Sequence, residues 1–435
     1  MQTHLIFGRN ARRTEALLRQ LEQRSSVATA QLEPAVRRIL SAIRREGDRA
    51  LRRYARKLDG LGAQSPLRVS REEMAEAWSA TPKELRASMQ IAAKNIRRFA
   101  QWQMPKNWTR RAASGLMLGQ RALPLDSVGC YVPGGRYPLP STLLMTTLPA
   151  QVAGVARIVV VSPRPARETL AAAHLAGVEE FYRIGGAQAI AALAYGTESL
   201  ARVDKIVGPG NLYVTTAKKL VAFDCGIDML AGPTEIVFAS ADGDAAYIAS
   251  DLVAQAEHDP NALAIFVTCN AALAQSVAQQ VQAQAQGNPI AQQSLKKNGY
   301  IFVTDSAQAM AATANRLAPE HLTIDAERDL DWVRHAGSIF IGDSTPQSMG
   351  DYISGPNHVL PTGRSARVRA GLSVYDYLRL VTTQSYTPAA MSVFGPHAAR
   401  LADAEGLRAH AASVRVRLRL QKRSAAKKNK EAAAR

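Results

Sequence analysis

The sequence has few cysteines, few aromatic residues and no long apolar run. Its 435 residues include only three cysteines, Cys130, Cys225 and Cys269, which are too few and too scattered for a disulfide framework. No uncharged apolar run of about 18 residues is present, and the N-terminus lacks the apolar stretch of a secretory signal. Since 47% of the residues are still hydrophobic, the chain can bury a sizeable core. We expect a soluble, cytoplasmic protein of two to three domains.

Negative charge is also scarce, because 54 Lys and Arg face 36 Asp and Glu, for a net charge of +18. The excess is concentrated at the two ends, where residues 1–60 and residues 411–435 each carry a net +8. The body of the chain is therefore nearly neutral. The N-terminal arginines alternate with apolar residues, which is typical of a solvated helix face, and we consider a nucleic-acid partner unlikely despite the basic termini.

The pattern of apolar residues predicts an α/β fold. Residues 10–105 have helical spacing, and strand-like and helix-like stretches then alternate from about residue 126. Expected strands include 157–162, 181–184, 205–207, 235–240 and 263–268, and expected helices include 167–176, 185–195, 212–222 and 245–258. Such alternation indicates mainly parallel sheets. After Ser373 we expect helix again, and then a disordered basic tail.

Three glycine-containing turns precede helix-like segments, at Gly134-Gly135, Gly185-Gly186 and Gly208-Pro-Gly-Asn211. Backbone N–H groups at such turns can approach an anion or a cofactor, although each turn alone is also compatible with an ordinary loop. Three of them in one α/β region indicate a ligand crevice at the strand ends. None has the GxGxxG spacing, so a dinucleotide would not be held by that fingerprint.

Side chains suited to metal binding and proton transfer gather in four other segments. Gln255 and His258 are three residues apart near a helix end, which suits two ligands of one metal but also a histidine that interacts with the helix dipole. Adjacent Glu320 and His321 follow a proline, and in an extended chain their side chains would diverge and serve two proton transfers, unless this is only a surface turn. The remaining candidates are Asp351, His358, Glu405 and His410.

Eight ordered motifs resemble the histidinol dehydrogenase family. They are CYVPGGRYPLPSTLLM, GPGNLYVTTAKK, AGPTEIV, AQAEHDP, APEHL, GDYISGPNHVLPTG, LSVYDYLR and EGLRAH, and the match runs from about residue 25 to 415. The resemblance implies two successive NAD-dependent oxidations that convert L-histidinol, through L-histidinaldehyde, to L-histidine, the last step of histidine biosynthesis. It also implies one Zn²⁺ per subunit and a homodimer with shared active sites.

The resemblance also assigns the site residues. Glu320 and His321 would be the acid–base pair. The Zn²⁺ ligands would be Gln255, His258, Asp351 and His410. The NAD contacts would be Tyr131, Gln188 and Asn211. The substrate pocket would be lined by Thr234, Gln255, His258, His321, Asp351, Glu405 and His410. Thr234 stands where many family members carry serine, and the hydroxyl is kept.

The fold implied by the resemblance is two incomplete Rossmann-like domains with parallel sheets, plus small helical N- and C-terminal pieces exchanged in a dimer. The predicted divisions are an N-terminal helical arm (1–26), a first Rossmann-like domain (27–130 and 236–372), an NAD-binding second one (131–235), a C-terminal helical dimerisation domain (373–420) and a disordered basic tail (421–435).

Two alternatives stay open at this point. One is a paralogous zinc- and NAD-dependent dehydrogenase of another small hydroxylated compound, such as a sulfonated diol, although Glu405 and His410 favour histidinol. The other is a thiohemiacetal mechanism through Cys130 or Cys225, for which no adjacent base is visible.

Overall fold

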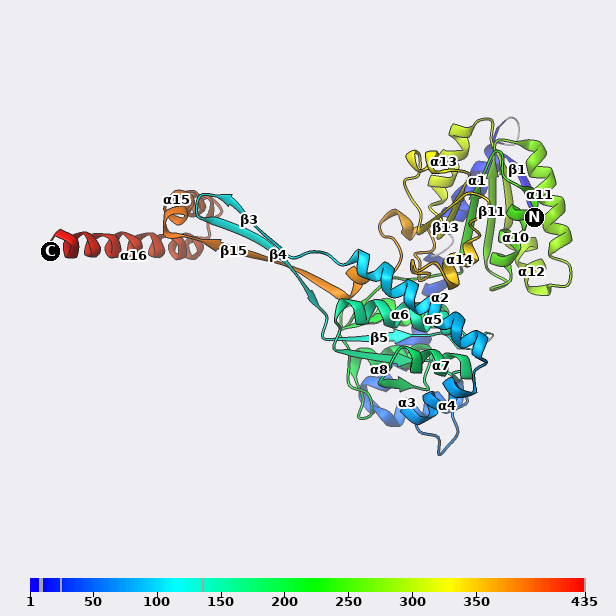
Figure 1. Cartoon of the computed structure of the whole chain (residues 1–435), viewed down its shortest axis with the longest axis horizontal. Coiled ribbons are helices and arrows are strands. Elements are labelled where there is room, and N and C mark those ends of the chain that lie inside the picture. The colour runs from blue at the N-terminus through cyan, green and yellow to red at the C-terminus, as the bar shows by residue number, and fades with distance from the viewer. Residues whose placement is uncertain (8–10, 24–25, 135–136, 434–435) are drawn as a thin grey trace. The chain divides into compact units, whose positions relative to one another are not determined.

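A computed structural model describes residues 1–7, 11–23, 26–134 and 137–433. Figure 1 traces the chain and its elements. The chain divides into two units: unit 1 is Met1–Met104 with Leu125–Tyr377, and unit 2 is Pro105–Pro124 with Leu378–Arg435. None of the described helices is both long enough and apolar enough to cross a membrane.

Sheet A of unit 1 is a six-stranded parallel sheet. Its strands, in spatial order, are β1 (Gln2–Leu5), β12 (Gly299–Val303), β11 (Leu263–Thr268), β10 (Glu235–Ala239), β13 (His321–Ile324) and β14 (Ser338–Ile341). Its helices are α1 (Ala11–Gln23), α10 (Ala245–Ala256), α11 (Ala271–Gln284), α12 (Pro289–Asn298) and α13 (Ala307–Leu317). Each of α10, α11 and α13 begins at an Asp, Asn or Ser whose side chain accepts hydrogen bonds from the first turn.

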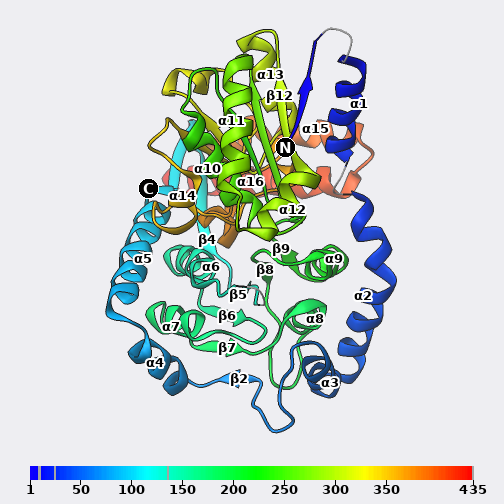
Figure 2. The same cartoon turned by 90° about the vertical axis from the view of Figure 1, so that its right-hand side faces the viewer.

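Sheet B of unit 1 repeats this strand order, with one short antiparallel strand at its edge. Its strands are β2 (Arg68–Val69), β7 (Glu180–Tyr182), β6 (Arg157–Val161), β5 (Ser127–Tyr131), β8 (Lys205–Val207) and β9 (Gly226–Ile227). Four helices, α6 (Pro140–Ala153), α7 (Arg167–Leu175), α8 (Gly186–Tyr195) and α9 (Leu212–Val221), complete it. Figure 2 shows α6 and α7 on one side of the strands and α8 and α9 on the other.

The N-terminal helices pack on sheet B. They are α2 (Ser26–Glu46), α3 (Asp48–Leu58), α4 (Arg71–Ala80) and α5 (Lys83–Gln103), and they contact α6, α7, α8 and α9. The predicted grouping of 27–130 with 236–372 remains a prediction, and within unit 1 these helices contact the helices of sheet B. The expected arm at 1–26 begins with strand β1, which pairs with β12 of the same chain.

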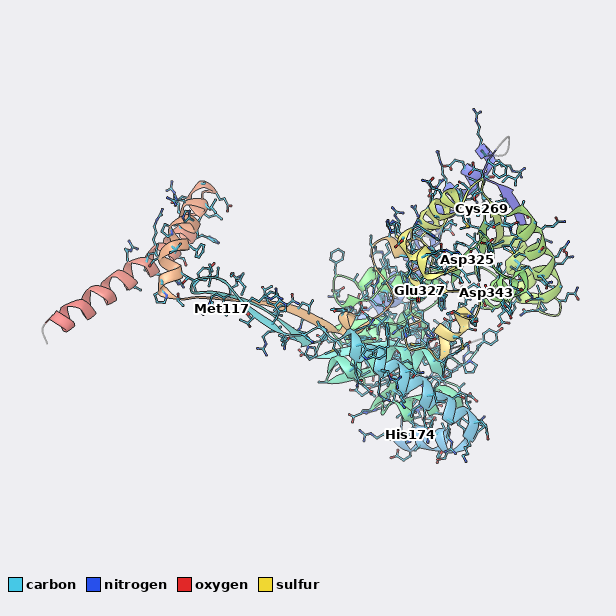
Figure 3. The ribbon with its side chains drawn as sticks, turned by 45° about the horizontal axis from the view of Figure 1, so that its top comes forward. Met117, His174, Cys269, Asp325, Glu327 and Asp343 are labelled. Atoms are coloured by element: carbon cyan, nitrogen blue, oxygen red, sulfur yellow. The ribbon has the colours of Figure 1, made fainter. Side chains whose placement is uncertain are left out.

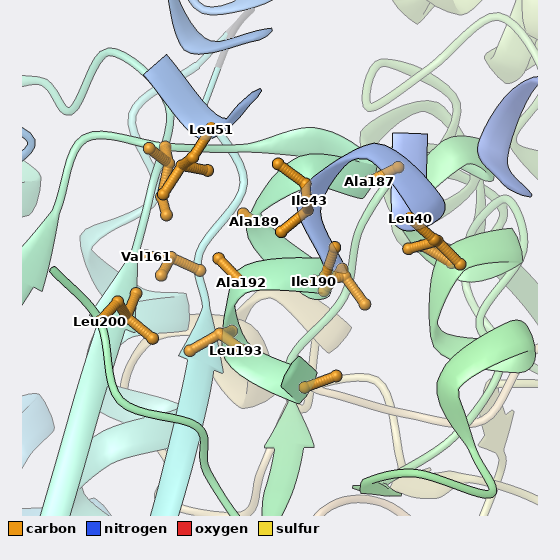
Figure 4. Close-up of a cluster of buried hydrophobic side chains, with 14 of the residues drawn as sticks. Leu40, Ile43, Leu51, Val161, Ala187, Ala189, Ile190, Ala192, Leu193 and Leu200 are labelled. Carbon is orange, nitrogen blue, oxygen red and sulfur yellow. The ribbon is translucent and has the colours of Figure 1, made fainter. Parts of the chain in front are cut away.

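The core between α8 and sheet B depends on small residues. Five alanines of α8 are buried, and Leu193 of the same helix packs in the cluster shown in Figure 4. Strand β5 carries Gly129 opposite this leucine, and a Cβ at Gly129 would lie 2.8 Å from a Leu193 methyl group. Small side chains therefore let the helix approach the sheet closely, which fixes the turn at its N-terminus.

Unit 2 contains an antiparallel sheet and two helices. The sheet order is β15 (Leu378–Tyr386), β4 (Leu116–Pro124), β3 (Trp108–Ala113), and the helices are α15 (Pro388–Ala404) and α16 (Arg408–Ala433). We expected only helix after Ser373, so β15 is a correction. α16 also continues to Ala433, into the segment expected to be disordered. Every residue of β15 has an exposed or half-buried side chain, so no buried face marks it in the sequence.

Short elements connect β13 to unit 2. They are the 3-10 helices η2 (Glu327–Asp331), η3 (Ser365–Arg367) and η4 (Val374–Tyr377), and helix α14 (Gln347–Tyr352). Helix α14 contacts α10, which brings the 351–358 motif to sheet A.

Candidate active site

Glu320 and His321 stand at the amino end of β13, which lies between β10 and the edge strand β14 of sheet A. Helix α13 ends at Leu317, and Ala318 then adopts a left-handed conformation with φ 46°. This turn and the following proline lead the chain into β13. Both side chains are buried, with exposed fractions of 6% and 3%. Glu320 Oε2 lies 3.7 Å from His321 Nδ1, so the two side chains converge on one another and do not diverge as we expected.

Glu320 accepts two hydrogen bonds at one carboxylate oxygen. Oε2 receives the hydroxyl of Thr234 at 2.6 Å and the backbone N–H of Glu235 at 2.9 Å. Both donors favour the ionised carboxylate. They stand at the amino end of β10, which is the neighbour of β13. The Thr234 that the resemblance assigned to the substrate pocket thus contacts the candidate base directly.

A hydrogen bond to the backbone carbonyl of Glu235 holds the ring of His321 in one tautomer. Nδ1 lies 3.2 Å from the carbonyl oxygen of Glu235, which only accepts, so Nδ1 carries the hydrogen and Nε2 has the lone pair. Nε2 is buried, has no hydrogen-bond partner among the described residues, and lies 3.5 Å from Asp351 Oδ1. Burial opposes protonation, but the carboxylates of Glu320 and Asp351 outweigh it and raise the pKa of His321. In this tautomer Nε2 is the ring nitrogen suited to accept a proton, with the Asp351 carboxylate 3.5 Å away.

A chain of hydrogen bonds orients Thr234. Gln347 of α14 donates from Nε2 to Gln255 Oε1 at 2.6 Å, and Gln255 Nε2 donates to Thr234 Oγ1. Thr234 then donates to Glu320. A carboxylate only accepts, so Thr234 gives its single hydrogen to Glu320 and must accept from Gln255, which fixes the direction of the chain from α14 to the carboxylate.

Asp351 and His358 belong to one connected group. The ring of His358 donates from Nδ1 to the backbone carbonyl of Asp351 at 2.7 Å, and its Nε2 accepts from Thr142 of α6 at 3.0 Å. Burial lowers the pKa of His358, which keeps the ring neutral. The sequence left His358 open as ligand, base or turn residue, and its contacts make it a neutral crosslink that holds Asp351. Burial disfavours the Asp351 carboxylate, but His321 outweighs burial and lowers its pKa.

A further carboxyl, Asp251 of α10, is buried near this group, with 7% of its surface exposed. Burial raises its pKa from 3.8 to about 6, and the negative charge of Asp351 adds to the rise. No sequence signal separated Asp251 from its apolar neighbours on α10.

Three of the four predicted metal ligands lie on or directly after helices α10 and α14, which contact one another. Gln255 is in the last turn of α10, His258 follows the helix end with an exposed side chain, and Asp351 is on α14. The helix ends at Ala256, two residues earlier than we expected. Among the described residues no three His, Cys, Asp or Glu side chains gather as a metal site. The fourth ligand, His410, and Glu405 are exposed on unit 2.

Two of the three predicted NAD contacts form a buried group at the carboxyl edge of sheet B. The hydroxyl of Tyr131, at the end of β5, accepts the Gly186 N–H at 3.0 Å. Gln188, in the first turn of α8, donates from Nε2 to Asp59 Oδ2 at 3.0 Å. Burial raises the pKa of both Tyr131 and Asp59. Asp59 was not a sequence candidate, because nothing in its local pattern links it to residues more than a hundred positions away.

The third predicted contact, Asn211, caps helix α9. Its side-chain oxygen accepts from the N–H groups of Tyr213 and Val214, and the side chain is exposed. The turn before it is fixed by a buried ion pair. Asp228 accepts the Gly208 N–H at 2.7 Å, and Lys218 donates to the Gly208 carbonyl at 3.0 Å and to Asp228. Gly208 has φ 110°, and a Cβ there would lie 2.1 Å from the Tyr131 carbonyl oxygen, so only glycine fits.

The cysteines do not fit a nucleophilic role. Cys130 and Cys225 are buried, and burial raises the pKa of each thiol to about 12. At neutral pH such thiols are not ionised, and the thiolate is the reactive form.

Comparisons with known proteins agree across almost the whole chain. The family model described as "Histidinol dehydrogenase" matches residues 22–418. A histidinol dehydrogenase from Gluconobacter oxydans is 46% identical over 410 residues, which are 92% of this chain and 95% of that protein. One from Synechococcus is 44% identical over 405 residues, or 90% of this chain and 93% of that protein. The crystal structure of histidinol dehydrogenase from Elizabethkingia anophelis matches with TM-score 0.90 at 35% identity, covering 97% of this chain and 99% of the other.

Proposed function

This chain belongs to the histidinol dehydrogenase family, and from that membership we propose that it oxidises L-histidinol, through L-histidinaldehyde, to L-histidine with NAD. The observation that carries the proposal is the state of His321. Its Nε2 is a buried lone pair without a partner among the described residues, with Asp351 beside it and Glu320 behind the ring. Such a group is suited to remove a hydroxyl proton in a site that excludes water.

In the first oxidation, His321 is the base. Nε2 accepts the proton of the substrate alcohol as the hydride departs. The resulting imidazolium is stabilised by the carboxylates of Glu320 and Asp351, at 3.7 and 3.5 Å from the ring nitrogens. The Nδ1 hydrogen bond to the Glu235 carbonyl holds the ring in place throughout.

In the second oxidation, water adds to the aldehyde, and Glu320 is the base for that water. The Thr234 hydroxyl and the Glu235 N–H hold its Oε2 in a fixed position. Because Thr234 is itself positioned by Gln255, the orientation of Glu320 depends on the buried amide chain from α14. The chain of amides therefore prepares the second step without contacting the reacting carbon.

NAD would be held at the carboxyl edge of sheet B by Tyr131, Gln188 and Asn211, and it supplies the hydride acceptor for both steps. Gln188 Oε1, which is buried and has no hydrogen-bond partner within the described part of the chain, fits such a ligand. Zn²⁺ would be held by Gln255, His258, Asp351 and His410, and its chemistry there is to orient the imidazole and amine of the substrate. An amide, a carboxylate and two imidazoles are ligands that suit Zn²⁺. Binding would require Gln255 Oε1, which now accepts from Gln347, to turn or share its lone pairs.

The exposed apolar side chains of unit 2 support the proposal of a homodimer with shared sites. The buried residues of unit 2 are mostly small, whereas Val393, Leu401 and Leu420 expose 61%, 68% and 56% of their surface. Apolar surface of this kind is normally covered by a partner. We propose that a second copy of this chain covers it and that Glu405 and His410 enter the partner's site. The cytoplasmic location remains a prediction.

The activity is tested by measuring NADH formed from L-histidinol by metal-replete protein at mildly alkaline pH, with and without a chelator. The proposal expects two NADH for each L-histidinol and a lower rate after chelation. A fully loaded enzyme that forms no NADH would refute it. Activity on a different small alcohol, with none on L-histidinol, would instead favour the paralogue.

Mixing two inactive variants tests the shared sites. His321→Asn damages unit 1 and His410→Asn damages unit 2, so each homodimer is inactive. If the sites are shared, a mixed dimer contains one site with both histidines intact, and mixing after subunit exchange restores activity. If each site is built from one chain, the mixture stays inactive.

A further inference from the structure

The Gln188 side chain leaves one buried polar atom without a partner. The residue is 1% exposed, and its Oε1 has no hydrogen-bond partner among the described residues. Its other amide atom faces Asp59 at 3.0 Å. Since a carboxylate only accepts hydrogen bonds, the atom toward Asp59 is the NH₂ group, and the oxygen faces the other way. A buried acceptor without a donor is costly unless something else supplies one.

Asp59 is well placed to fix this orientation. It is 6% exposed and follows helix α3, and its Oδ2 also accepts the Gly185 N–H at 3.1 Å. Two donors converge on one carboxylate oxygen, which prevents the Gln188 amide from rotating without losing a charge-assisted hydrogen bond.

A side chain at position 186 would press against Gln188 Oε1, and Gly186 avoids that contact. This glycine has φ 60°, a left-handed conformation, and a Cβ there would lie 2.9 Å from Oε1. Glycine at such a position allows a ligand to approach the backbone.

The same contacts disfavour a phosphate at this helix end. The Gly185 N–H is paired with Asp59 and the Gly186 N–H with the Tyr131 hydroxyl, so two of the N–H groups that could bind a phosphate at this helix N-terminus are in use. The carboxylate also places negative charge there. Gln188 Oε1 only accepts hydrogen bonds, so its partner on the ligand has to be a donor such as a hydroxyl or an amide N–H, which an ionised phosphate does not offer.

We propose that Asp59 is a positioning residue for NAD: it holds Gln188 so that the amide oxygen faces the cofactor and accepts a hydrogen bond from a hydroxyl or a carboxamide NH₂, not from a phosphate. The inference rests on the proposed function. In that function Gln188 recognises a hydrogen-bond donor on NAD, and Asp59 sets the orientation of Gln188.

Direct titration of NAD into the full-length protein by calorimetry tests the proposal. Asp59→Leu removes the acceptor and frees the amide to rotate, so NAD affinity should fall by about tenfold or more. Asp59→Asn keeps an acceptor and should recover most of that loss. Gln188→Glu places two carboxylates together and should also weaken NAD. In Asp59→Asn/Gln188→Glu the new amide can donate to the new carboxylate, so affinity should return above that of Gln188→Glu alone.

A second aspartate that borders α3 provides the control for a merely structural role. Asp48 begins this helix and accepts the Ser199 N–H at 3.3 Å, but it does not touch Gln188. Asp48→Leu should lower the unfolding midpoint and leave NAD affinity unchanged. The KM for L-histidinol should change little in any Asp59 variant.

The outcomes separate the two proposals. If Gln188→Ala leaves NAD affinity unchanged, NAD does not bind here, and both the placement and this inference fail. If Gln188→Ala weakens NAD but Asp59→Leu does not, the inference alone fails. Failure of Asp59→Asn to rescue Gln188→Glu would also overturn it, and this pair of variants remains informative even if Asp59→Leu does not fold.

Discussion

Sheets A and B share a strand order but place their functional groups at opposite edges. In sheet B, Tyr131 closes β5, Gln188 follows β7 and Asn211 follows β8, so all three stand at the carboxyl edge. In sheet A, Thr234 precedes β10, and Glu320 and His321 open β13, at the amino edge. Helix α10 runs back along the sheet, so its last turn delivers Gln255 to that same edge.

The contrast suggests how one fold could support two tasks. The carboxyl edge of a doubly wound sheet is the usual ligand crevice, and the proposed NAD contacts of sheet B lie there. In sheet A that edge carries Asp325 and Asp343, labelled in Figure 3 just beyond β13 and β14. There, Asp325 accepts the Ala241 N–H at 3.0 Å and so closes the turn after β10. The proposed acid–base pair of sheet A is instead at the strand starts, where backbone groups of Glu235 contact both Glu320 and His321.

The largest expected effect is at the amino edge of sheet A. His321→Asn removes the base and should lower the rate of L-histidinol oxidation by about 10²–10⁴-fold. Glu320→Gln should mainly slow the oxidation of L-histidinaldehyde, because a neutral amide cannot accept the proton of the water that adds to the aldehyde. Rapid-mixing measurements of NADH formation from each compound separate the two steps. Equal losses in both half-reactions would show that the two residues do not divide the work.

At the carboxyl edge of sheet B, the buried pair Lys218–Asp228 should dominate stability. Lys218→Met leaves the Asp228 carboxylate buried without its partner, which typically costs about 3–5 kcal/mol in the free energy of unfolding. The exposed pair Arg71–Glu179, whose side chains are 67% and 73% exposed, is the control. Denaturant titration should show a change of at most about 1 kcal/mol for Arg71→Met. Similar values for both variants would contradict a special role for the Gly208 turn.

The dependence of stability on pH tests the raised pKa of Asp251, the buried acid beside sheet A. The pKa of Asp251 is raised from 3.8 to about 6, so the folded state retains a proton that the unfolded state has lost. Its contribution to stability is therefore present below pH 3.8 and is lost as the pH rises to about 6. We compare the free energy of unfolding of Asp251→Asn with that of wild type at low pH and at pH 7.5. On going from low pH to pH 7.5, this difference should shift in favour of the variant by up to about 3 kcal/mol. Parallel stability curves for the two proteins would argue against the raised pKa.

The smallest effect is expected from the basic tail. Deleting residues 421–435 removes none of the residues placed at either sheet edge. Changes away from such residues usually have small effects, so the turnover number should stay within about twofold of wild type. A steady-state assay on the shortened chain measures it. A collapse of activity would mean that the tail takes part in folding or catalysis.

The sequence predicted the buried parts of the fold better than the exposed ones. Strands such as β6 and β11 are runs of buried β-branched or aromatic residues, and their positions follow from composition. Strands β3 and β15 expose nearly all of their residues, so no alternation marks them. Glu320 and His321 were candidates from their residue types alone, but Thr234 was named only through the family resemblance, since a strand start carries no general signal. Asp59, Asp228 and Gln347 act through tertiary contacts that a linear pattern does not contain.

The division of labour between the two sheets is tested most directly by crossed Michaelis constants. Gln188→Ala alters sheet B and Thr234→Ala alters sheet A, and the KM for NAD and for L-histidinol is measured for each. The account predicts that Gln188→Ala raises mainly the KM for NAD, whereas Thr234→Ala affects L-histidinol binding or turnover and leaves the KM for NAD near wild type. If both variants change the same constant, the two edges do not hold separate ligands.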